Sequence, residues 1–533
     1  MAHLTDPPPP PSQLDTTELE ARGPRGLTTG ERAALRRRLS PRWAFFSLAV
    51  LGLLGVTLWL RYTAPTPPPT ARVPAPRPRS VAVLPLVNAS PDTANDYFSN
   101  GLTEELTAVL GRAPGLRVAA PSSAFALRGR SEEPREVGRT LGVGTVLEGS
   151  VRQANDRLRL TVHLVSVSEG FDLWSETYER SPGEIFAVLE EIARSVVSAL
   201  RVPGAEAWEP AVPASSSLGA YAAYLRARHS LTNPRGRDPT YAAALYQESI
   251  RLDSSFAPAW GGLATAHVRR VMDHGAQPSE AMPAARVAAT RALALDSTLA
   301  PAHTALAQVR FLYDWDWAAA DSAFQRALAI NPNRPEVHHW YSHLLLAIGR
   351  EDEALVRGRR ALELSPLDPD VIAHLGWHHL LVRRYADARE SLDRALVVDS
   401  SRADTRRLLG LLAEVLGDYE LAESHYRGAL DRAPGDLEVL ASLGRTHALD
   451  ERPDEARAVL ARLDSLTAER YVSPYLFVGI AEALDDRRRA FAWLGEAVAD
   501  RVGQLVYLDL DPRLDRLRGD RRFARIRRQV GLP

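Results

Sequence analysis

The chain of 533 residues contains neither cysteine nor lysine, so all 65 of its basic residues are arginine. The absence of cysteine excludes disulfides, zinc sites with thiolate ligands, iron–sulfur clusters and cysteine nucleophiles. The absence of lysine excludes protein kinases, P-loop ATPases and enzymes that bind pyridoxal phosphate as a Schiff base, because each class needs a lysine for its chemistry. Several large enzyme classes are therefore ruled out.

The chain also lacks an excess of charge of either sign. Its 65 arginines are balanced by 66 acidic residues, and the formal net charge is −1 at pH 7. A nucleic-acid-binding protein would show a strong basic excess, so we expect no nucleic-acid partner. The length is sufficient for roughly three or four domain-sized units.

The amino-terminal part has the pattern of a membrane anchor. Residues 1–42 are polar and contain five consecutive prolines, which predicts a disordered cytoplasmic tail. Residues 43–60 are uncharged and would rise about 27 Å as a helix, enough to span a bilayer. Arginines are more frequent before this run than directly after it, which favours a cytoplasmic amino terminus. A cleaved signal peptide is the alternative, and residues 61–80 predict a proline-rich linker.

Residues 81–201 alternate between strand and helix patterns. Strands are predicted at 81–87 and 116–119, helices at 97–110 and 184–200, and a three-stranded meander over 145–178. Glu104 and Glu105 are interpreted as part of a solvated helix face. The patterns predict a small α+β domain with a mixed sheet, followed by a linker over 202–218 that allows some independent movement.

The order of motifs in this segment resembles the TolB amino-terminal or FlgO-like domain of bacterial envelope proteins. The resemblance rests on residues 98–106, 116–118, 146–152, 157–160 and 174–178. It implies a binding or assembly module without catalytic residues, located outside the cytoplasmic membrane. Together with the arginine distribution, it predicts a single-pass protein of the bacterial inner membrane with most of the chain in the periplasm.

Small residues recur every 34 positions in the remainder of the chain. The series are Ala327, Ala361, Ala395 and Ala429; Ala320, Ala354, Ala388, Ala422, Ala456 and Ala490; and Ser342, Gly376, Gly410 and Gly444. This period resembles the tetratricopeptide repeat, in which small residues allow two helices to approach closely. The resemblance implies an all-α solenoid, a right-handed superhelix of about eight helical pairs over 219–502. Residues 503–533 are expected to form capping helices.

Histidines in the repeats suggest a metal site, but the pattern is weak. His339 and His343, and separately His374 and His378, are spaced to share a helix face. No His-Glu-x-x-His motif accompanies them, and the repeat register assigns the two pairs to different faces. We therefore expect no metal and no cofactor.

The concave groove of a repeat solenoid is the predicted binding surface. The repeat register places on it a mixed polar and aromatic set suited to a peptide. The set comprises Gln308, Phe311, His339, His343, Trp377, Arg407, Glu414 and Arg445.

Three functions are compatible with these patterns. The favoured hypothesis is a non-catalytic, membrane-anchored scaffold that binds a protein or peptide in the cell envelope. The second is the sensory or regulatory arm of a signalling system whose kinase or cyclase is a separate chain, because the order of segments also resembles the non-catalytic half of bacterial membrane-anchored kinases and adenylate-cyclase-related regulators. The third is a metal-dependent enzyme that uses the histidine-rich face.

Overall fold

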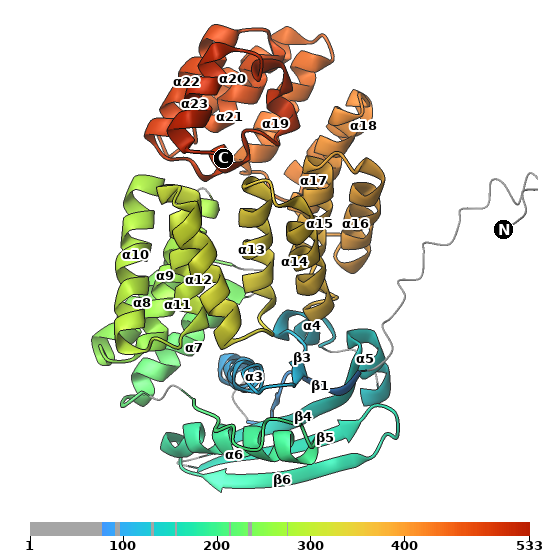
Figure 1. Cartoon of the computed structure of the whole chain (residues 1–533), viewed down its shortest axis with the longest axis vertical. Coiled ribbons are helices and arrows are strands. Elements are labelled where there is room, and N and C mark those ends of the chain that lie inside the picture. The colour runs from blue at the N-terminus through green and yellow to red at the C-terminus, as the bar shows by residue number, and fades with distance from the viewer. Residues whose placement is uncertain are drawn as a thin grey trace, which may run out of the picture. The chain divides into compact units, whose positions relative to one another are not determined.

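The computed structural model describes residues 77–90, 96–128, 133–154, 157–212, 215–232, 237–273 and 275–532 (Figure 1). Among these residues, no helix combines the length and the apolar character needed to cross a membrane. This finding contradicts the predicted transmembrane anchor and the predicted inner-membrane location. The segment in which we expected the span, residues 43–60, lies outside the described residues, as do the tail and the linker up to residue 76.

The first folded elements form a mixed sheet. Its strands are β1 (Arg77–Val83), β2 (Val87–Asn88), β3 (Arg117–Val118), β4 (Val143–Ala154), β5 (Arg157–Ser166) and β6 (Asp172–Arg180). The strand order is β3-β1-β4-β5-β6, and β2 pairs with β4. Strand β1 runs parallel to β3 and β4, whereas β4, β5 and β6 form an antiparallel meander. The sheet is therefore mixed, as the sequence patterns predict.

Alternation along β5 shows why this segment forms a half-buried strand. Leu158, Leu160, Val162 and Leu164 are each no more than 2% exposed, while the intervening residues are exposed or half-buried. The buried face packs with residues of α3 (Asp96–Leu110) and α6 (Ile185–Ala199) in one core. The short helices α4 (Pro121–Ala126) and α5 (Pro134–Leu141), and the 3-10 turn η2 (Pro182–Glu184), complete this part.

The connection to the repeats is packed rather than free. Val202, Ala205 and Val212 are buried in the same core as α3 and α6. The carboxylate of Asp253 accepts hydrogen bonds from the Ser215 hydroxyl at 2.7 Å and the Ser216 N–H at 2.9 Å. The proline and serine content of residues 202–218 suggested independent movement, but the buried apolar residues of this segment fix it to the core.

Sixteen helices in the described residues form eight consecutive antiparallel pairs (Figure 1). The pairs are α7 (Leu218–Thr232) with α8 (Pro239–Leu252), α9 (Ala257–Met272) with α10 (Pro278–Leu295), α11 (Ala300–Val309) with α12 (Trp317–Ile330), α13 (Pro335–Ala347) with α14 (Glu351–Leu364), α15 (Pro369–Leu381) with α16 (Tyr385–Val398), α17 (Ala403–Val415) with α18 (Tyr419–Leu430), α19 (Leu437–Leu449) with α20 (Pro453–Leu466), and α21 (Tyr475–Ala483) with α22 (Arg487–Ala499). Aspartate side chains cap the amino ends of α8, α12, α15, α18, α19 and α22 by accepting backbone N–H groups.

Small residues set the spacing between the helices of each pair. The alanines of both 34-residue series are completely buried. A Cβ added to Gly410 would lie 2.6 Å from a ring carbon of Tyr426, and one added to Gly376 would lie 2.9 Å from Leu392. The first helix of each of these repeats therefore lies against a large residue of the second helix at a distance that only glycine allows.

The carboxyl-terminal residues form two 3-10 turns, η4 (Gly503–Tyr507) and η5 (Pro512–Leu517), and helix α23 (Arg521–Val530). Their apolar residues pack on α21 and α22. The carboxyl-terminal segment also contacts the third repeat, in which a short π-helical turn, η3 (Arg310–Asp314), joins α11 to α12. Here the Trp317 indole donates to the Gly531 carbonyl at 2.7 Å, and Arg501 donates to the Tyr313 carbonyl at 2.8 Å. The cap thus connects the last repeat with one nearly 200 residues earlier in the chain.

A buried ion pair connects α3 with the first repeat helix. Glu104 and Glu105 are 6% and 7% exposed, and both pair with Arg228 of α7. The Tyr224 hydroxyl also donates to Glu105, at 3.1 Å. The prediction of a solvated helix face is therefore wrong, because α7 covers that face of α3.

A second contact connects the sheet part with the middle repeats. The Asn333 amide donates to the carbonyl oxygens of Gly111 at 3.1 Å and Leu116 at 2.8 Å. The Ser122 and Ser365 hydroxyls lie 2.7 Å apart. Both ends of the α+β part are thus fixed against the solenoid.

We expect Gly410→Ala to be about 1–3 kcal/mol less stable than Gly428→Ala, because the new methyl group overlaps the Tyr426 ring. Gly428 also lies within a helix but has nothing closer than 3.8 Å to its Cβ position, so both variants gain the same helix propensity. Urea unfolding followed by circular dichroism measures the difference. Equal stabilities would contradict the close-approach interpretation.

We expect Arg228→Met to lower the free energy of unfolding by about 3–5 kcal/mol, because it leaves Glu104 and Glu105 buried without a counter-charge. Adding Glu104→Gln and Glu105→Gln to this variant should restore part of the loss. Arg251→Met, which removes an exposed pair with Glu248, should remain close to wild type. An equal loss in Arg251→Met, or no recovery in the triple variant, would contradict the prediction.

Candidate functional site

A cavity of about 1560 Å³ lies on the inner side of the repeats. Its wall is formed by the first helices of the repeat pairs from α7 to α19, by α3 and α4 of the sheet part, and by η4 and η5 of the cap. The sheet part and the cap, which do not belong to the repeats, therefore close a space that the solenoid alone would leave as an open groove.

Three histidines meet on one wall of the cavity. His339 and His343 come from α13 and His374 from α15, and one ligand atom of each lies within 4.8 Å of those of the other two. His343 Nε2 lies 3.1 Å from His374 Nδ1, and His343 Nδ1 lies 2.8 Å from the Tyr507 hydroxyl. Their rings pack with Trp340 and Trp377. We call His339, His343 and His374 the histidine triad.

Burial lowers the pKa of His339 and His343 well below the ordinary value, and the neighbouring histidines lower it further. Burial likewise lowers the pKa of His378, behind the triad, to about 3. These three imidazoles are therefore neutral at neutral pH. Burial raises the pKa of Tyr507, so its hydroxyl stays protonated.

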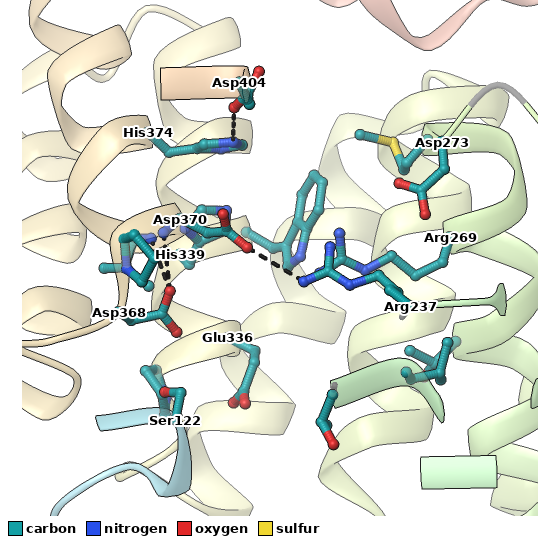
Figure 2. Close-up of a pocket in the computed structure, with 18 of the residues that line it drawn as sticks. Ser122, Arg237, Arg269, Asp273, Glu336, His339, Asp368, Asp370, His374 and Asp404 are labelled. Carbon is teal, nitrogen blue, oxygen red and sulfur yellow. Dashed lines mark hydrogen bonds and ion pairs between the residues drawn. The ribbon is translucent and has the colours of Figure 1, made fainter. Parts of the chain in front are cut away.

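The carboxylate of Asp404 contacts one histidine of the triad, His374. Asp404 Oδ2 lies 3.7 Å from His374 Nε2 (Figure 2). Arg407 binds the same carboxylate at 2.6 Å. Burial raises the pKa of Asp404, but the Arg407 charge and the His374 contact outweigh burial and hold the pKa below its ordinary value. Asp404 is therefore an ionised partner for His374.

Arginines occupy the opposite wall. Arg237 and Arg269 reach toward the triad side from the segment before α8 and from α9 (Figure 2). Arg237 pairs with Asp370 at 3.3 Å, and Arg402 pairs with the same carboxylate. The Arg269 guanidinium makes no hydrogen bond or ion pair with any other residue that the structure describes. Burial and the Arg237 charge lower the pKa of Arg269, and the more distant carboxylates of Asp273, Asp368 and Glu336 offset this only in part.

The structure brings together half of the residues that the sequence placed in the groove. His339, His343, Trp377 and Arg407 line the cavity. Gln308 and Phe311 are 5% and 0% exposed and do not line it, because the η3 turn directs this part of the third repeat into the core.

Glu414 and Arg445 form a buried ion pair instead of lining this cavity. Arg445 also lies 3.4 Å from Glu482, and Thr446 donates to Glu414 at 2.8 Å. Cap residue Arg516 pairs with Glu482 in turn. The groove ends earlier than the repeat register suggests, because the cap covers the last repeats.

Sequence reasoning missed His374, Asp404, Tyr507 and Arg269 as residues of this site. The register assigned His374 to a different face from His339, whereas the structure places the two rings 4.8 Å apart. The histidine spacing was the available signal for His374. No pattern in the sequence indicated Tyr507, which reaches the site from the cap.

Two sequence models described as tetratricopeptide repeat match residues 375–436 and 416–472. A Rhizobium meliloti protein named "Putative adenylate cyclase 3" is 36% identical over 216 residues, which cover 37% of this chain and 36% of that protein. Superkiller protein 3 of Schizosaccharomyces pombe is 26% identical over 229 residues, 42% of this chain and 16% of that protein. The chain thus spans about a third or less of the length of these two relatives.

Among solved structures, pilF of Pseudomonas aeruginosa is 23% identical and covers 40% of this chain and 92% of its own, with a TM-score of 0.31. The segment that the two tetratricopeptide-repeat models match, residues 375–472, runs from within α15 past the end of α20. This chain therefore contains tetratricopeptide repeats, which supports a role as a scaffold for protein–protein contacts.

Proposed function

We propose that this chain is a non-catalytic scaffold that binds an extended segment of a partner protein in the cavity described above. The proposal rests on the size and the lining of the cavity. Its volume is about 1560 Å³, and aromatic, histidine and charged side chains border it. Aromatic rings such as Trp340 and Trp377 provide apolar contact area, and the charged groups can select polar side chains. His339, His343, Trp377 and Arg407 are the proposed contact residues.

Arg269 indicates which kind of side chain the bound partner segment presents to the cavity. Its guanidinium lines the cavity beside Arg237 and has no partner among the described residues. Burial next to a like charge disfavours the charged form, and a carboxylate from a ligand would reverse that effect. We therefore infer that the bound segment presents an aspartate or glutamate to Arg269.

Selection of a random peptide library on the purified full chain should yield peptides rich in acidic and apolar residues. We expect Arg269→Met to weaken the binding of a selected peptide about tenfold or more, because a hydrogen bond to a charged group contributes about 1.5–3 kcal/mol. Isothermal titration calorimetry measures the dissociation constants.

Arg457→Met is the matched control, since this arginine is 64% exposed and does not line the cavity. It should bind the peptide as the wild type does. Equal weakening in both variants, or unchanged binding in Arg269→Met, would contradict the proposed contact.

A regulatory arm for a separate catalytic chain is the second candidate function. It is favoured by the 36% identity with part of a protein named as an adenylate cyclase. Deletion of residues 1–42 separates the two candidates. A scaffold should keep its bound partner after the deletion, whereas a relay that acts through this tail should lose its output in a cyclase or kinase assay of the partner.

A further inference from the structure

We propose that the histidine triad of His339, His343 and His374 binds a divalent transition-metal ion of the zinc class. The observation behind the proposal is that α13 and α15, two inner helices of successive repeats, bring three imidazoles to one point on the cavity wall. His339 and His343 are also proposed peptide contacts, but metal binding can be tested without a peptide because the site needs only residues of this chain.

The distances suit such an ion. Zinc binds histidine nitrogen at about 2.0–2.1 Å, so tetrahedral ligands lie about 3.3 Å from one another. His343 Nε2 and His374 Nδ1 are already 3.1 Å apart. One nitrogen of His339 lies within 4.8 Å of one nitrogen of each of the other two histidines. It therefore approaches by at most about 1.5 Å on binding, which a rotation of its side chain supplies.

The outer contacts orient two of the rings for this role. Metal-binding histidines usually donate their second N–H to a carboxylate or another polar group. His374 Nε2 faces Asp404, which Arg407 holds in place, so His374 Nδ1 is directed to the site. His343 Nδ1 lies 2.8 Å from the Tyr507 hydroxyl and 3.3 Å from His378 Nε2, so its Nε2 is directed to the same place. The Asp404–His374 contact resembles the carboxylate–histidine–metal arrangement of known sites.

The ligand set decides the class of ion. Three imidazoles suit zinc, copper, nickel or iron, whereas calcium and magnesium prefer oxygen ligands. Three protein ligands leave one tetrahedral position open, as in zinc sites that bind water or a substrate. Because all three residues line the cavity, we infer that this open position faces the bound ligand.

The test is a titration of the chelator-treated, dialysed full chain with Zn²⁺, followed by calorimetry and by competition with a chromophoric chelator. We expect one ion per chain with a dissociation constant of micromolar or lower. Titration with Co²⁺ should give the visible absorption of a four-coordinate nitrogen site. His339→Gln and His374→Gln should each weaken Zn²⁺ binding at least tenfold while circular dichroism shows an unchanged fold.

Asp404→Asn provides a second, milder variant. It should weaken Zn²⁺ binding about 10- to 100-fold without changing the stoichiometry, because it removes an outer contact and no ligand. His303→Gln is the matched control, since this repeat histidine bonds the Ser297 carbonyl and does not line the cavity. The proposal is overturned if the folded wild type binds no Zn²⁺, if both triad variants bind as the wild type does, or if His303→Gln loses binding to the same extent.

Discussion

The close approach of paired helices at small residues is the constraint on which the rest of the structure depends. Buried alanines on both helices of each repeat, and glycines such as Gly376 and Gly410, bring neighbouring backbones near enough for one large residue to fill the gap. Because the same contact recurs every 34 residues, each repeat is displaced from the last by a similar step, and the first helices accumulate on one side. The cavity is a direct consequence of this repetition.

Closure of the cavity comes from elements that do not follow the repeat. The sheet part is fixed by Arg228 between Glu104 and Glu105, and by Asn333 at its other end. These contacts place α3 and α4 on the cavity wall, and the cap adds Tyr507 from the opposite end of the chain. A groove that would face solvent thus becomes a partly enclosed site, where buried imidazoles stay neutral and ionic contacts are less screened.

The parts of the fold and of the site that could be predicted are those set by patterns local in the sequence. The alternation along β5 and the 34-residue period arise between residues close in sequence, so strands, helices and repeats could be predicted from them. The buried role of Glu104 could not, because its counter-charge, Arg228, lies 124 residues further along the chain. Likewise, the histidine triad depends on the offset between successive repeats, and Tyr507 reaches it only because the cap folds back. The predicted membrane anchor, which no helix of the described residues supports, rested on an uncharged run and on the arginine distribution and not on any packing pattern.

The return of the cap to the third repeat changes how the solenoid can unfold. In an open array each repeat contacts only its neighbours, so the terminal repeats can unfold while the others stay folded. Here the Trp317–Gly531 and Arg501–Tyr313 hydrogen bonds connect turns of the array that are not neighbours. The last repeats therefore cannot separate without also breaking contacts at the third, so this stretch loses its structure as one cooperative unit. Such long-range pairing also slows folding, because the loop between the contacts must close first.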